Sequence, residues 1–346
     1  MTTWDYDLSF TMEQQLQTEW CWAATSTSVS VFYDPVNSPW SQCTVVNAEQ
    51  AQTTCCQNGA SSKCNVSWYL EKALTRTKNL NYYVNNSLSI SDLDKELKNG
   101  RPMGTRIGWA GGGGHFNVLG GASTKDSRVH VHDPIYGDLD YDYNSYCTKY
   151  QGTGTWTHSY YTQTYQNPQG CIALLVQVLF GRRRQGLPAP QPKVSGVNVS
   201  LPVFTQRLDD LASGKGLSTA QETGLWNIVV GESGDVYAED TEPGSTIIRS
   251  VSRGALVMET FRNINEVGRQ QASEKIPFET RLLQVPGIYV FALWLKAPQD
   301  NDDVLIAMKP APTALRAGVR YARPEFEAIV RPLAEARLRF DERPNS

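Results

Sequence analysis

Hydrophobic and polar positions over the first hundred residues predict a series of short helices. Small and apolar residues recur through "CWAATSTSVSVFY" (21–33), and Asp34-Pro35 ends that pattern, because proline cannot continue a helix. The segments "SWYLEKALTRT" (67–77) and "SISDLDKELKNG" (89–100) show a similar periodicity. The second of these begins with a serine cap and ends on Gly100, as helices commonly do.

After residue 100 the pattern changes to that of strands. The segments "HFNVLGGA" (115–122) and "SRVHVHDP" (127–134) predict a hairpin around Gly120-Gly121. The longest apolar run, "CIALLVQVLF" (171–180), is expected to form a buried strand. It has about half of the ~20 residues that a membrane-spanning helix needs, so no membrane span is predicted. Helices followed by strands indicate an α+β domain.

The composition changes near residue 182 and predicts two domains. The segment "FGRRRQGLPAPQPK" (180–193) is rich in arginine and proline, and no cysteine or histidine follows it. We therefore expect a domain over residues 1–181, a linker over 182–193 and an accessory α+β domain over 194–346. In the accessory domain, strands are expected at 225–231 and 287–296, a helix at 203–213, and a charged tail from about 313 that is helical or loosely ordered.

The number of cysteines and the net charge indicate the compartment of this protein and exclude one class of ligand. An odd number of cysteines, seven, suits three disulfides and one free thiol. The alternatives are reduced structural thiols, or zinc held by the middle group (Cys43, Cys55, Cys56 and Cys64), which lacks the usual two-residue ligand spacing. Disulfides predict secretion or another route of export to an oxidising compartment, although the N-terminus shows no signal peptide. A net charge of −3 without a basic helix argues against nucleic-acid binding.

Cys21 is the candidate nucleophile because it stands at the start of the first predicted helix. A helix N-terminus and a nearby imidazolium both favour the reactive thiolate. His115 follows four glycines and begins a strand, and Asp133 ends the next strand, so a hairpin would bring the two side chains together. The backbone N–H of Cys21 and the side chain of Gln15, six residues upstream, are candidate donors to an oxyanion. His130 and His132 alternate onto the opposite strand face and are expected to be structural.

These segments resemble the papain superfamily. "Q-x5-CW" before a helix, "GGHFNVLGGA" and "VHDP" are most similar to its bacterial branch, which includes effector proteases of plant pathogens, over residues 10–180. The resemblance implies a helical half packed on a twisted antiparallel β half, with Cys21 as nucleophile, His115 as base, Asp133 as orienting group and Gln15 as oxyanion donor. Papain has asparagine where this chain has Asp133. Trp22 and Gly114, beside the proposed nucleophile and base, are expected to contact substrate.

The first interpretation is therefore a cysteine endopeptidase that acts on proteins or peptides without a metal or cofactor. A deamidase or an acyl transferase would use the same triad and differ only in what enters the cleft. A catalytically silent binding protein is the alternative from another class. The accessory domain has no recognisable motif; it could bind substrate, bind a secretion partner, or cover the cleft until the linker is cut.

Overall fold

The computed structural model describes residues 2–164, 199–230, 235–271 and 278–340. The predicted strand at 171–180, Cys171 and the predicted linker at 182–193 lie outside these residues. We call residues 2–164 the N-terminal part and residues 199–340 the C-terminal part. Within the described residues no helix is both long and apolar enough to cross a membrane.

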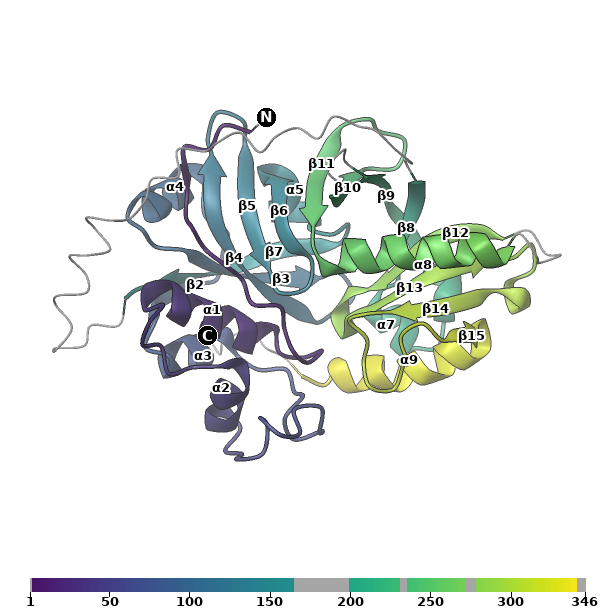
Figure 1. Cartoon of the computed structure of the whole chain (residues 1–346), viewed down its shortest axis with the longest axis horizontal. Coiled ribbons are helices and arrows are strands. Elements are labelled where there is room, and N and C mark those ends of the chain that lie inside the picture. The colour runs from purple at the N-terminus through teal and green to yellow at the C-terminus, as the bar shows by residue number, and fades with distance from the viewer. Residues whose placement is uncertain (1, 165–198, 231–234, 272–277, 341–346) are drawn as a thin grey trace.

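The first three helices of the N-terminal part lie together on one side of its strands, whereas the other two lie beside the strands (Figure 1). Its elements are β1 (Tyr6–Asp7), α1 (Cys21–Tyr33), α2 (Gln42–Glu49), α3 (Leu70–Arg76), β2 (Leu80–Val84), α4 (Ile90–Lys98), β3 (Met103–Trp109), β4 (Gly114–Ser123), β5 (Arg128–Asp133), β6 (Gly137–Asp142), α5 (Tyr143–Lys149) and β7 (Gly154–Thr162).

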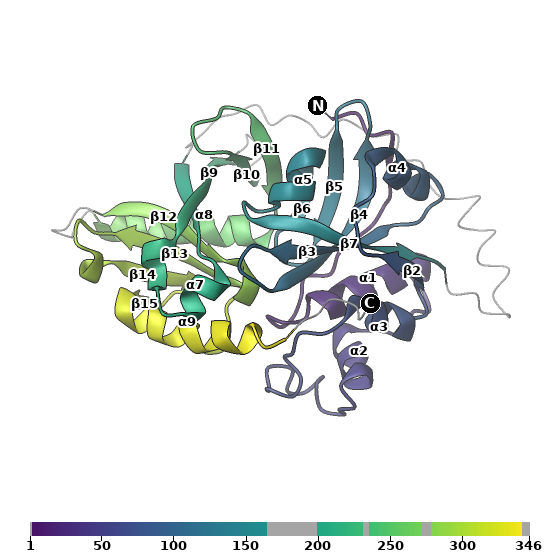
Figure 2. The ribbon, with the colours of Figure 1, turned by 180° about the vertical axis from the view of Figure 1, so that it is seen from behind.

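The C-terminal part places helices on both faces of its strands (Figures 1 and 2). Its elements are β8 (Val199–Thr205), α7 (Leu208–Ala212), η1 (Gly216–Thr219), β9 (Gln221–Val230), β10 (Val236–Thr241), β11 (Ile248–Arg253), α8 (Ala255–Gln271), β12 (Glu279–Val285), η2 (Pro286–Ile288), β13 (Val290–Lys296), η3 (Asp300–Asp302), β14 (Val304–Met308), β15 (Arg320–Ala322) and α9 (Arg323–Arg337).

The helices of the N-terminal part begin and end close to where the sequence predicts. Helix α1 runs from Cys21 to Tyr33, and its first ten residues are all buried, because small side chains let it pack closely against β4 and α3. In α4 the side chain of Ser89 accepts a hydrogen bond from the Asp92 amide, and Gly100 follows with a φ of +73°. The predicted α+β class is confirmed, with helices and one large mixed sheet.

A single sheet passes through both parts of the chain. Its strand order is β15-β14-β13-β12-β8-β9-β10-β11-β6-β5-β4-β3-β7-β2, with β1 added beside β4. The join is the antiparallel pair β6–β11, in which Leu139 lies opposite Ser252. The larger hydrophobic core likewise contains residues from both parts, whereas a smaller core lies wholly in the C-terminal part between α7, α9 and β12–β14.

Two local predictions need correction. Strands β4 and β5 do pair antiparallel, but Gly120 and Gly121 lie within β4 at a bulge, and the turn is formed by residues 124–127. The predicted helix at 203–213 is helical only over Leu208–Ala212. Its first residues belong to β8, because alternating burial over Val199–Thr205 and pairing with both β9 and β12 favour a strand.

Candidate active site

Cys21 is the first residue of α1 and its side chain is almost enclosed, with 4% of the residue exposed. The indole N–H of Trp20 donates to the Cys64 carbonyl at 2.8 Å, and that of Trp22 donates to the Val66 carbonyl at 2.9 Å. Both tryptophans therefore tie the start of α1 to the loop that follows α2. Because the first N–H groups of a helix have no partner within it, the Cys21 thiol lies where the helix dipole favours negative charge.

The loop that receives these tryptophans is crosslinked by two disulfides, Cys43–Cys56 and Cys55–Cys64. The middle cysteines are therefore bonded to each other, and the zinc alternative is wrong for them. Cys21 and Cys147 are free thiols in the described part of the chain. Of the three disulfides expected from the sequence, two are present among these residues.

His115 and Asp133 meet as the antiparallel arrangement of β4 and β5 predicts. Nε2 of His115 lies 2.8 Å from Oδ2 of Asp133, and both side chains are fully enclosed. Oδ2 also accepts hydrogen bonds from the Tyr150 hydroxyl at 2.7 Å and from the Asn117 amide at 3.2 Å. The backbone amides of Ile135 and Tyr136 donate to Oδ1. Five donors therefore fix this carboxylate in one orientation.

The buried pair favours the charged form of both groups. Burial lowers the pKa of His115, but the charge and hydrogen bond of Asp133, together with Cys21, outweigh it and bring that pKa to about 10. Burial raises the pKa of Asp133, yet His115 and the donors from Tyr136 and Tyr150 lower it below its usual value. Since Nε2 is bonded to Asp133, Nδ1 is the ring nitrogen that remains to exchange a proton with the thiol. Nδ1 has no hydrogen-bond partner among the described residues.

The remaining predicted site residues are Trp22, Gly114 and Gln15. Trp22 and Gly114 line a small depression beside Cys21, and their contact with substrate stays a prediction. Gln15 is buried, but its amide donates to the carbonyls of Gln17 and Thr18, at 2.9 and 2.7 Å. Both of its donor hydrogens are therefore used within the loop that leads to α1. Its role as an oxyanion donor stays a prediction.

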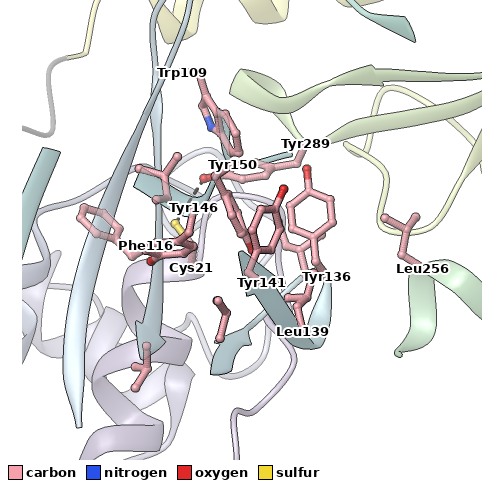
Figure 3. Close-up of a cluster of buried hydrophobic side chains, with 14 of the residues drawn as sticks. Cys21, Trp109, Phe116, Tyr136, Leu139, Tyr141, Tyr146, Tyr150, Leu256 and Tyr289 are labelled. Atoms are coloured by element: carbon pink, nitrogen blue, oxygen red, sulfur yellow. Dashed lines mark hydrogen bonds between the residues drawn. The ribbon is translucent and has the colours of Figure 1, made fainter. Parts of the chain in front are cut away.

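No sequence pattern indicated Tyr289, a residue of the C-terminal part that lies beside the nucleophile. The hydroxyl of Tyr289 is 3.2 Å from Sγ of Cys21 and donates to the Gly114 carbonyl at 3.0 Å. Figure 3 shows the Tyr289 ring beside Cys21, within a group of buried aromatic side chains that includes Trp109 and Tyr150. The depression at Cys21 contains about 170 Å³ of empty space, part of which is open to solvent.

The glycine run before His115 allows the C-terminal part to come close to the site. Gly111, Gly112 and Gly113 all have positive φ angles, +94°, +111° and +80°. A Cβ atom on Gly112 would lie 2.5 Å from the Leu338 side chain, and one on Gly113 would lie 3.3 Å from the Gly287 backbone. In this structure residues of the C-terminal part occupy the space beside these glycines.

A comparison with known protein families covers the same part of the chain. Residues 3–151 match the sequence model of the family described as papain-like cysteine protease AvrRpt2. The matched range contains the Cys21 helix, the paired His115 and Asp133, and both disulfides. No curated protein matches the chain. Over residues 3–151 the chain is therefore similar to the papain-like cysteine proteases of the AvrRpt2 family.

Proposed function

We propose that the chain is a cysteine endopeptidase in which Cys21, His115 and Asp133 form the catalytic triad. The observation that carries the proposal is the enclosed His115–Asp133 pair, which keeps the imidazole charged and oriented. Cys21 attacks the peptide carbonyl as a thiolate, and Nδ1 of His115 then protonates the leaving amine. A water molecule, deprotonated by His115, hydrolyses the resulting thioester and restores the thiol.

The developing oxyanion needs two donors in this reaction. The backbone N–H of Cys21 is one, because it lies in the first turn of α1. The amide of Gln15 is the second, and it must leave at least one of the carbonyls of Gln17 and Thr18 to reach the substrate. The oxyanion hole is therefore completed only when the loop before α1 rearranges.

A deamidase or acyl transferase would use the same three residues. No contact in the described residues favours either over peptide hydrolysis, whereas the family match concerns a protease. Two disulfides are compatible with an oxidising compartment, and we propose export on that basis.

The test is covalent labelling with an epoxysuccinyl peptide inhibitor, followed by peptide mapping, together with hydrolysis of an unstructured protein such as casein. We expect one adduct, on Cys21, and loss of both labelling and hydrolysis in Cys21→Ser. The matched control is Cys147→Ser, which removes the other free thiol of the described residues. Hydrolysis that persists in Cys21→Ser would contradict the proposal.

A further inference from the structure

We infer that the C-terminal part holds the peptidase latent by seating Tyr289 on Cys21, an inference that rests on the proposed function. The hydroxyl of Tyr289 lies 3.2 Å from Sγ, and Tyr289 lines the depression beside Cys21. His115 is fully enclosed and Cys21 nearly so. A peptide chain therefore cannot reach the nucleophile unless Tyr289 moves.

Hydrogen bonds hold the phenol in this position. Its hydroxyl donates to the Gly114 carbonyl at 3.0 Å and lies within hydrogen-bonding distance of Sγ of Cys21, where either atom can be the donor. Tyr289 is therefore anchored both at the nucleophile and at the residue before His115.

Several elements of the C-terminal part hold Tyr289 in place. Gly287, in η2, packs against the glycine loop, and the amide of Asp209 in α7 donates to the Gly111 carbonyl at 3.2 Å. At the end of α9, Leu338 contacts Gly112, and the ring of Phe340 lies 5.6 Å from that of Tyr69. We define these contacts, together with Tyr289, as the cap.

The cap also carries a charge contact at the rim of the depression. Nε of Arg337, at the end of α9, lies 3.9 Å from a carboxylate oxygen of Glu19, and both residues line the depression next to Cys21. The residues on either side of the nucleophile are therefore bound to the C-terminal part by packing, hydrogen bonding and charge. Activation requires the cap to leave the glycine loop.

The experiment compares the unsubstituted chain with Tyr289→Gly. Tyr289 has a φ of +53°, a conformation that glycine adopts without strain, so the substitution removes the side chain and leaves the backbone favourable. Labelling of Cys21 by an epoxysuccinyl peptide is followed by intact mass and mapping. We expect the rate constant to rise at least tenfold in Tyr289→Gly. Tyr321→Gly, in β15 of the same part, is the matched control for loss of a buried tyrosine.

Iodoacetamide, which is small, separates local opening from general loosening. Cys147 is half-buried and lies on α5, so its alkylation rate should stay unchanged while that of Cys21 increases. Tyr289→Asn repeats the test if the glycine variant does not fold, because asparagine also tolerates positive φ.

The outcomes separate the cap from the chemistry. Equal epoxide labelling of the wild type and Tyr289→Gly would overturn the cap and leave the peptidase intact. Slower labelling of the variant would also overturn it and make Tyr289 a participant in catalysis. Faster alkylation by iodoacetamide, with no epoxide adduct and no hydrolysis in either form, would support the cap and contradict the peptidase.

A second, independent observation concerns Asp7, His130 and His132. The geometry points to a site for a divalent transition metal such as zinc, formed where β1, β4 and β5 lie side by side. One ligand atom from each of the three residues lies within 4.8 Å of the others. Two imidazoles and a carboxylate are a common zinc donor set.

The arrangement around His132 is that of a metal ligand. Its Nδ1 lies 2.8 Å from a carboxylate oxygen of Asp138, which places the ring proton on Nδ1. Nε2 then carries a lone pair, and this atom is buried with no partner among the described residues. Carboxylates that orient a histidine in this way are typical of zinc sites.

The bulge in β4 provides the space. A Cβ atom on Gly120 would lie 2.5 Å from Nε2 of His132, and one on Gly121 would lie 2.5 Å from Oδ1 of Asp7. Oδ1 of Asp7 in turn lies 2.9 Å from Nδ1 of His130. The two glycines therefore leave room for side chains that converge from both neighbouring strands. A bound metal would crosslink β1 to β5.

The test is calorimetric titration with zinc chloride of a chain in which Cys21, Cys147 and Cys171 are serine, so that thiols do not compete. We expect one equivalent of zinc, a higher melting temperature, and at least tenfold weaker binding in His130→Gln and in His132→Gln. Asp126→Asn, which changes another acidic residue at the same edge, should bind as the parent does. No binding at micromolar zinc, or unchanged affinity in both histidine variants, would overturn the site.

Discussion

Nε2 of His115 lies 2.8 Å from Oδ2 of Asp133, although 18 residues separate them along the chain. The pair forms because His115 begins β4 and Asp133 ends β5, and these strands run antiparallel. Donors from Tyr150, Asn117 and two backbone amides surround the carboxylate. The orientation of the imidazole is therefore fixed by the sheet and its turns.

Asp133→Asn should reduce peptidase activity strongly while leaving the fold intact. The amide cannot stabilise an imidazolium as a carboxylate does, so we expect kcat/KM to fall on the order of 10²-fold. The pH profile of Cys21 alkylation should shift, which loss of structure alone would not produce. Asp138→Asn, which removes the carboxylate from His132 instead, is the control. An unchanged profile in Asp133→Asn would contradict the assigned role.

Stability should depend on pH through the same pair. The pKa of His115 rises from 6.5 to about 10 on folding, so its contribution is fully present below about pH 6.5 and is lost as the pH rises through about 10. The lowered pKa of Asp133 gives a contribution present above its unfolded pKa and lost as the pH falls through its folded one. Denaturant unfolding between pH 6 and 10 should show a decline that is smaller in His115→Gln. If the free energies of unfolding of the wild type and of His115→Gln changed equally with pH, this assignment would be contradicted.

The disulfides should stabilise the chain and support the start of α1. Each closes a short loop, with sequence separations of 13 and 9 residues. Replacing Cys55 and Cys64 by alanine should lower the free energy of unfolding by roughly 2–3 kcal/mol. Because the Cys64 carbonyl accepts the Trp20 indole, labelling of Cys21 should change as well. Cys147→Ala is the control, and equal stability of both variants would refute the role of the bond.

The mass of the unreduced protein checks both bonds directly. Two disulfides make it about 4 Da lighter than the reduced chain, since each bond removes two hydrogens. A deficit of about 6 Da would reveal a third bond, between two of Cys21, Cys147 and Cys171. No deficit would contradict both bonds and the inference of an oxidising compartment.

Gly111→Ala should loosen the cap through a change in the N-terminal part, at the glycine loop that the cap contacts. A Cβ atom there would lie 2.7 Å from Oδ1 of Asp209 and 3.1 Å from the Leu208 amide, so α7 must shift. Gly100→Ala is the matched control, because Gly100 also has a positive φ but open space around its Cβ position. We expect both variants to lose stability through backbone strain, and only Gly111→Ala to label faster at Cys21. Equal labelling rates would show that α7 does not hold the cap.

The sequence predicted the local parts of the site well. Local sequence patterns predict where α1 begins and ends, the serine at the N-terminus of α4, and the strand that starts at His115. Strand pairing then predicts the contact between His115 and Asp133. The predicted helix at 203–213 is wrong over its first residues, because the pairing of β8 with strands far along the chain outweighed the local pattern. The contact between Tyr289 and Cys21 joins residues 268 positions apart, and no periodicity in either segment encodes it.

The β6–β11 pair limits how the protein can be switched on. If the whole C-terminal part were released, β6 would expose unpaired backbone groups, and such bare edges recruit strands from other molecules. Shared strands also make the two parts unfold together, so their stabilities cannot be separated by dilution or mild heating. Activation therefore requires a hinge motion that keeps the β6–β11 pair intact. In that motion only η2 and the end of α9 move away from the glycine loop.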